Sequence, residues 1–105
     1  MKKISIFERV GADAENKDIG REIRLKEILP LLERNEEIIL DFEGVQTASQ
    51  SFIHSLISDA MRTYKNDALD RIIFKSCNDS IQQMINIVVE YMQDALAKER
   101  QEGKR

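Results

Sequence analysis

The sequence predicts an α/β fold in which three helices cover a small sheet of three to four mostly parallel strands. Three short apolar runs alternate with three longer segments whose apolar residues repeat at helical spacing. The connections between successive runs are long enough to hold a helix, which favours parallel strands joined by right-handed crossovers. With 105 residues, the chain is expected to form one domain, residues 1–105.

Residues 3–10 form the first predicted strand, because apolar and polar residues alternate weakly there. A polar loop follows, and the first helix is predicted to begin at Asp18, its expected cap, and to end at residues 33–35. Pro30 lies inside this helix. Its ring removes one backbone hydrogen bond and crowds the preceding turn, so we expect the helix to be distorted there.

Residues 38–42 are apolar almost without interruption, which is typical of a central strand covered on both faces. A second helix is predicted from Ser51 to Tyr64, because a broad apolar stripe repeats along it at helical spacing. The polar segment 65–70 is expected to end this helix.

Residues 71–75 form the third predicted strand, and a long third helix follows. Asp79 and Gln82 have the spacing of a capping box at its start. Residues 98–105 are expected to be a frayed tail. A sheet this narrow leaves two edges close to its centre, and pairing in a homodimer is one way to cover them.

The composition excludes several classes of protein. The net charge of −3 argues against a nucleic-acid partner, because domains that bind phosphates usually carry a clustered basic face. Cys77 is the only cysteine, so neither an intramolecular disulfide nor a cysteine metal cluster can form. No apolar run has the length of a signal peptide or a membrane span. We therefore expect a cytoplasmic protein without membrane contact, metal or cofactor.

A patch of polar side chains between the central strand and the second helix is the main candidate site: Thr47, Ser49, Gln50 and Ser51, followed one turn later by His54. In α/β proteins, ligands bind beyond the carboxyl ends of parallel strands. A hydroxyl at a helix start also lies near free backbone N–H groups that favour a phosphate. The patch therefore either binds a partner or merely supplies a serine cap, and the spacing alone favours the cap.

Two catalytic interpretations are weaker. Asp41 and Glu43 would point to the same face of a strand, as an acid/base pair requires, but no further ligand supports them. Ser51 and His54 are three residues apart on one helix face, but the sequence contains no GxSxG elbow or comparable motif. We therefore predict no catalytic residue, and a small hydrolase or transferase that uses Ser51, His54 and Asp41 stays as an alternative.

The stretch "EIILDFEGVQTASQSFIHSLI", with "KDIGREIR" before it and "DRIIFKSCND" after it, resembles the STAS-like domains of bacteria. These are related to the STAS domains of anti-sigma factor antagonists. The resemblance spans roughly residues 17–92 in order. It implies partner switching, in which such a domain binds a kinase-type anti-sigma factor, is phosphorylated on a serine at this helix start, and then dissociates.

This sequence departs from the antagonists at the turn. Their pattern is Asp-Ser-Ser-Gly, whereas Ser49, Gln50, Ser51 and Phe52 stand here, so Gln50 takes the place of the usual phosphoacceptor. The antagonists also usually have two strands before the first helix, and the sequence predicts one. Ser49 and Ser51 remain as candidate acceptors beside that position.

The leading expectation is a non-enzymatic regulatory module that binds a protein partner through residues 47–54. The resemblance suggests a histidine-kinase-like ATPase or another anti-sigma-type protein as the partner. The main alternative is a structural dimer or complex subunit whose third helix makes the contacts.

Overall fold

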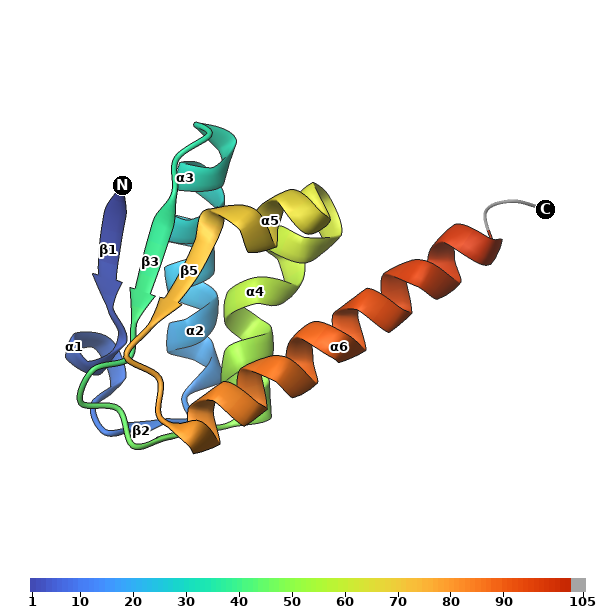
Figure 1. The fold of residues 1–105 in the computed structure, drawn as a ribbon. Coiled ribbons are helices and arrows are strands. Elements are labelled where there is room, and N and C mark those ends of the chain that lie inside the picture. Colours follow the sequence, from blue (N-terminus) through green and yellow to red (C-terminus); the bar gives the residue numbers. More distant parts are fainter. Residues whose placement is uncertain (103–105) are drawn as a thin grey trace.

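The computed structural model describes residues 1–102, and the side chains of residues 1–98. Its main sheet contains the parallel strands β1 (Lys2–Ser5), β3 (Ile38–Asp41) and β5 (Ile72–Lys75), with β3 in the middle (Figure 1). The α/β class, the parallel strands and the central place of β3 are therefore confirmed.

The two faces of this sheet differ. In one register row, Ile4, Leu40 and Phe74 lie side by side, and Ile4 and Leu40 are fully buried under the helices. In the neighbouring row on the other face, Ile39 is half-buried and Ile73 is 40% exposed. The central strand is thus fully covered on one face and only partly on the other, and the expectation of two covered faces is wrong.

The first strand is shorter than predicted. It ends at Ser5, whose hydroxyl accepts a hydrogen bond from the backbone N–H of Glu8 and caps a short helix, α1 (Ile6–Val10). The predicted strand over residues 3–10 is wrong in its second half, because this cap turns the chain into a helix. Gly11, with φ of 78°, ends α1 in a conformation that favours glycine.

A second, two-stranded parallel sheet pairs β2 (Asp13–Ala14) with β4 (Thr47–Ala48). The sequence does not predict it, and the expectation of a single sheet is wrong. Each strand has only two residues, which is too short for an alternating pattern to show.

The first predicted helix is one continuous helical segment made of α2 (Lys17–Ile23), a π-helix η1 (Arg24–Ile28) and α3 (Leu29–Glu33). The π-helix ends at Ile28, so it lies in the turn before Pro30, which confirms the predicted distortion. Because Pro30 has no N–H to donate, the wider turn before it accommodates the break in the hydrogen-bond ladder.

The start of this segment differs from the prediction. The cap is Asn16, whose Oδ1 accepts hydrogen bonds from the N–H groups of Asp18 and Ile19. Asp18 is therefore inside the first turn, where its charge interacts favourably with the helix dipole. Both Asn16 and Asp18 are good caps, so the sequence alone does not discriminate between them.

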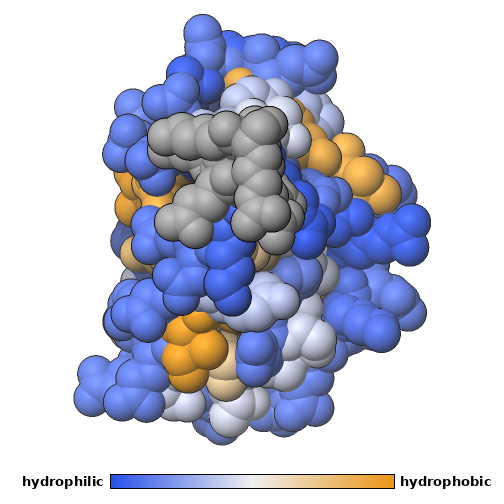
Figure 2. Space-filling model, turned by 90° about the vertical axis from the view of Figure 1, so that its right-hand side faces the viewer, coloured by the Kyte–Doolittle hydropathy of each residue, from blue (hydrophilic) through white to orange (hydrophobic). Residues whose placement is uncertain are grey.

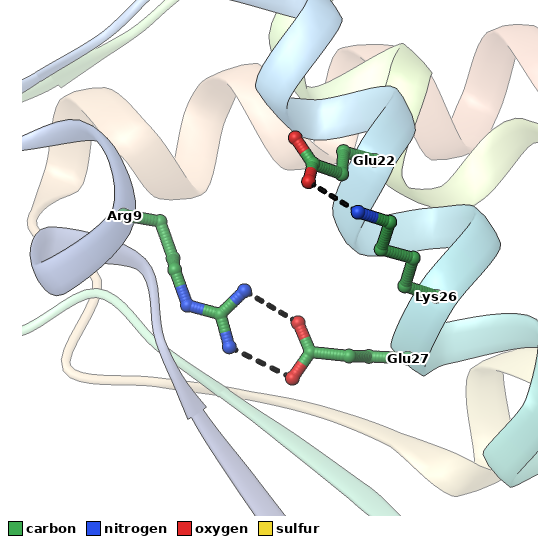
Figure 3. A network of polar contacts seen from close by, with 4 residues as sticks. All are labelled: Arg9, Glu22, Lys26 and Glu27. Atoms are coloured by element: carbon green, nitrogen blue, oxygen red, sulfur yellow. Dashed lines mark hydrogen bonds and ion pairs between the residues drawn. The ribbon is translucent and has the colours of Figure 1, made fainter.

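One ion pair holds the helical segment against α1, and a second lies within the segment (Figure 3). Arg9 makes a two-point contact with Glu27, with its guanidinium nitrogens 2.5 and 2.7 Å from the carboxylate oxygens. One turn earlier, Lys26 Nζ lies 2.7 Å from Glu22 Oε1 on the exposed face of the same segment. The Arg9–Glu27 pair links two elements that are distant in sequence, whereas the Glu22–Lys26 pair is local to one helix.

The second predicted helix is α4 (Gln50–Tyr64), and Ser49 caps it. Lys65 ends it with φ of 56°. The segment predicted to break the helix is itself helical, since α5 (Asn66–Arg71) follows at once. Within residues 1–102 the chain thus has five helical segments rather than the three predicted, the additions being α1 and α5.

The third predicted helix is α6 (Asp79–Glu102), which continues into the segment predicted to be a frayed tail. Residues 103–105 lie outside the described part of the chain. The predicted capping box is wrong, because Asn78 Oδ1 accepts the hydrogen bond from the N–H of Ile81 instead. Figure 1 shows the C-terminal half of α6 extending well beyond the rest of the molecule.

The core lies between the main sheet and the helices. Its largest fully buried side chains include Phe42, Phe52, Ile53 and Leu56. Figure 2 shows that the face from which α6 projects is mainly hydrophilic, with small separate hydrophobic areas. Of the helices in the described residues, none is apolar over a length that could cross a membrane.

Candidate partner-binding surface at the start of helix α4

The loop before α4 is fixed by neighbours on two sides. The backbone N–H of Ser49 donates to the carbonyl of Ala14 over 2.9 Å, which extends the β2–β4 pairing. Asn78, at the start of α6, donates from its Nδ2 to the carbonyl of Gln46 over 2.9 Å. The predicted site residues are therefore presented by a loop whose backbone is held in place.

Ser49 is the residue that caps α4. Its Oγ accepts a hydrogen bond from the N–H of Phe52 over 3.1 Å, and lies 3.3 Å from the Oγ of Ser51. Ser49 is half-buried, and its backbone is extended, as is usual at an N-cap. The capping interpretation of the patch thus applies to Ser49.

The other predicted residues differ in what they contact. Thr47 donates its hydroxyl to Asp13 Oδ1 over 2.8 Å, joining β4 to β2. Gln50 and Ser51 occupy the first two positions of α4 and are both exposed. Thr47 and Ser49 thus support the local structure, whereas no side-chain hydrogen bond of Gln50 is found among the described residues.

His54 is half-buried one turn farther along α4, and its ring centroid lies 6.4 Å from that of Tyr91 on α6. The pKa of His54 is lowered, mainly because burial disfavours the charged imidazolium and also because Arg62 is nearby. At neutral pH the ring is uncharged. Tyr91 is 59% exposed, so it extends the surface beyond His54 onto α6.

The residues of the enzymatic alternative do not converge. Asp41 lines a hollow of about 590 Å³ at the ends of β1 and β3, where its carboxylate accepts the N–H of Glu43 and lies 3.2 Å from Lys3 Nζ. Ser51 and His54 line a different hollow, between α2 and α4. A catalytic group made of all three would need them within hydrogen-bond reach.

Asp41 and Glu43 both line the first hollow, but Glu43 follows the end of β3 in a turn, so the two do not share a strand face as predicted. The Glu43 N–H, followed by the Lys3 ammonium, holds the pKa of Asp41 below its ordinary value despite burial. Asp41 is therefore ionised at neutral pH and interacts with the Glu43 N–H and the Lys3 ammonium. In the described residues, no cluster of three His, Cys, Asp or Glu side chains has the geometry to hold a metal ion.

Sequence reasoning misses a row of cations beside the predicted surface. The hollow between α2 and α4, about 320 Å³, is lined by Lys17, Arg21, Arg24 and Arg62. The first three have spacings of four and three residues, which place them on one side of a helix. That spacing is visible in the sequence, but the opposing Arg62 is not, because only the fold brings α2 and α4 together.

Comparison with known protein families gives one informative match. A family described as a STAS-like domain of unknown function (DUF4325) matches residues 20–82, which contain the main part of α2, all of α4 and the predicted site. Neither a curated protein nor a solved structure matches the chain. The resemblance to STAS-like domains is confirmed, and the chain belongs to the family of the STAS-like domain of unknown function (DUF4325).

Proposed function

We propose that this protein is a non-enzymatic regulatory module that binds a protein partner through the start of α4. The α4 surface consists of Thr47, Ser49, Gln50, Ser51 and His54. One observation carries the proposal: Ser49 alone caps the helix, while Gln50 and Ser51 are exposed beside it. A helix start that only needed a cap would need one such side chain.

The α4 surface is suited to regulation by charge. Ser51 is the second residue of a 15-residue helix, and the first turn of a helix carries partial positive charge and free N–H groups. A phosphoryl group on Ser51 would add about −1.5 to −2 charges there and change the fit of a charged partner. The resemblance to antagonist STAS domains suggests a histidine-kinase-like ATPase as that partner.

Capture of the tagged protein from its native cells tests the proposal, followed by a binding titration with the captured partner. We compare the wild type with Ser51→Glu and record the intact mass of the bait. The expected result is a histidine-kinase-like ATPase that the wild type retains and Ser51→Glu loses, because the new charge lies inside the contact.

Ser80→Glu is the matched control. Ser80 is exposed and is the second residue of α6, just as Ser51 is the second residue of α4, so the same change is made at an equivalent helix position. This variant should bind like the wild type. Unchanged affinity of Ser51→Glu, or equal losses in both variants, would contradict the proposal.

A second candidate function is that of a structural dimer or complex subunit. It is favoured by the projection of α6 beyond the body of the molecule and by the exposure of Ile87 and Tyr91 on that helix. Truncation after Gln93 keeps the buried residues of α6, such as Met92. Loss of self-association in this truncated chain, measured by sedimentation, would support this function.

A further inference from the structure

The groove between α2 and α4 is lined by more cationic than acidic side chains, although the chain as a whole is negatively charged. Lys17, Arg21, Arg24 and Arg62 line it, against the two carboxylates of Asp18 and Asp59. The chain as a whole has a net charge of −3. Four cationic and two acidic side chains in one groove therefore form a local positive site on an acidic protein.

Two cations of the groove, Arg24 and Arg62, share a single carboxylate. Arg24 Nε lies 3.3 Å from Asp59 Oδ2, and Arg62 Nη1 lies 3.2 Å from Asp59 Oδ1. The Arg24 side chain is only 14% exposed, and its Nε is buried without a hydrogen bond. One carboxylate thus faces two guanidinium groups, and the Nε of the poorly solvated Arg24 is left without a hydrogen bond.

The other two cations of the groove are Lys17 and Arg21. Lys17 and Arg21 are exposed, and neither makes an ion pair with a side chain of residues 1–98. They lie four residues apart, on the side of α2 that faces α4. They are therefore available to an anion that enters from outside.

The opposite wall of the groove leaves space for such an anion. On α4, Ser51, Ser55 and Ser58 line it at spacings of four and three residues, so short side chains stand opposite the long cations of α2. Ser51 belongs both to this wall and to the α4 surface. The groove is thus continuous with the surface proposed to bind the partner.

We infer that the α2–α4 groove binds an acidic segment of the protein partner, whose Asp or Glu carboxylates pair with Lys17, Arg21 and Arg24. This inference rests on the proposed function and names the chemistry of the partner. Guanidinium groups bind carboxylates in a two-point geometry, and opposite charges across an interface speed association and set specificity.

Fluorescence anisotropy with a labelled probe tests the inference on the full chain. The probe is a short peptide rich in Asp and Glu, and the reference is the same peptide with every carboxylate replaced by its amide. The wild type should bind the acidic peptide and not the amide peptide, with weaker binding at high salt. Lys17→Glu/Arg21→Glu should bind the acidic peptide roughly tenfold or more weakly, because its charges oppose the ligand.

Lys2→Glu/Arg34→Glu is the control, since it makes the same change in net charge at two exposed positions outside the groove. It should bind nearly as well as the wild type. Lys17→Gln/Arg21→Gln, which adds no repulsion and preserves helix propensity, should also lose affinity. Three outcomes would each overturn the inference. The groove and control variants could lose affinity equally, or the wild type could fail to bind the acidic peptide. The wild type could also bind a single-stranded oligonucleotide more tightly than the acidic peptide.

The captured partner separates this inference from the proposed function. If Ser51→Glu loses the partner while Lys17→Gln/Arg21→Gln keeps it at wild-type affinity, the α4 surface binds the partner and the groove inference fails. If the wild type captures no partner but binds the acidic peptide through the groove, the proposed partner class fails and the groove chemistry stands.

Discussion

Gly20 of α2 lies against Ser55 of α4 so closely that a methyl group at Gly20 would overlap the Ser55 hydroxyl. The same methyl group would come within 3.3 Å of the Cβ of Ser55 and of Cδ1 of Phe52, which is fully buried. The Ser55 hydroxyl is itself engaged, donating to the carbonyl of Phe52 over 2.6 Å. This contact sets the separation of the two helices that form the groove.

Gly20→Ala should therefore destabilise the protein, although alanine favours helix more than glycine does. We expect crowding to lower the free energy of unfolding by about 1 to 3 kcal/mol, measured by urea denaturation. Ser55→Ala in the same chain should recover part of this loss, because it removes the hydroxyl that the new methyl group meets. A Gly20→Ala variant as stable as the wild type would show that α2 and α4 tolerate a wider separation.

The two serines of the α4 surface should respond differently to alanine. Ser49→Ala should lose about 1 kcal/mol of stability, because it removes the acceptor for the N–H of Phe52. Ser51→Ala should change stability little, because Ser51 is exposed and its hydroxyl contact with Ser49, over 3.3 Å, leaves the cap of the helix in place. Thermal unfolding compares the two, and Ser49→Asp, which keeps an acceptor, serves as the control. Equal losses would mean that both serines support the helix start.

The sequence predicts the parts of the fold in which one pattern persists over many residues. The apolar run at β3 and the stripe along α4 are examples, because each is long enough to show its periodicity. The prediction from sequence fails where one hydrogen bond decides whether a segment forms a strand or a helix. The Ser5 hydroxyl converts the end of a strand into α1, and the same residues could have continued the strand. Strands of two residues, such as β2, carry no pattern at all.

The sequence likewise predicts one part of the candidate site and not the other. The polar residues from Thr47 to His54 can be recognised in the sequence because they lie close together at the start of a predicted helix. The groove cannot be recognised, because Arg21 and Arg62 are far apart in the chain and meet only when α2 packs on α4. The sequence does not predict Tyr91 as part of the site for the same reason, since its contact with His54 depends on where α6 lies.

Asp41 should contribute stability that depends on pH. It is 5% exposed, and its carboxylate accepts the N–H of Glu43 over 3.0 Å and faces Lys3 at 3.2 Å. Its pKa is lowered in the folded protein, so this contribution is full above the ordinary pKa of aspartate and is lost as the pH falls through the folded value. Asp41→Asn should lose about 1 to 2 kcal/mol at neutral pH, because the N–H of Glu43 then donates to a neutral oxygen and Lys3 loses its ion pair.

Urea denaturation at neutral pH and at a pH below the folded pKa of Asp41 measures this effect. The difference between the wild type and Asp41→Asn should shrink at the lower pH, because the protonated acid resembles the amide. Lys3→Met provides a comparison: it should cost less than Asp41→Asn, since Lys3 is 54% exposed and solvent weakens its ion pair. A difference that does not depend on pH would show that Asp41 acts through packing rather than through its charge.

His54 is the only histidine, so its titration can be followed by NMR without assignment of other rings. We expect its pKa to lie below the ordinary value of 6.5, chiefly because of burial and then because of Arg62. Arg62→Gln should raise the pKa by removing a positive charge. Asp59→Asn should lower it further, because the Asp59 carboxylate favours the imidazolium.

The lowered pKa of His54 also sets a direction for stability. Unfolding restores the ordinary pKa, so the unfolded chain binds more protons than the folded one as the pH falls below about 6.5. Stability should therefore decrease as the pH falls from above that value to below the folded pKa, and His54→Gln should reduce this decrease. A measured pKa at or above 6.5, or an unchanged pH dependence in His54→Gln, would contradict a half-buried neutral ring beside the cationic groove.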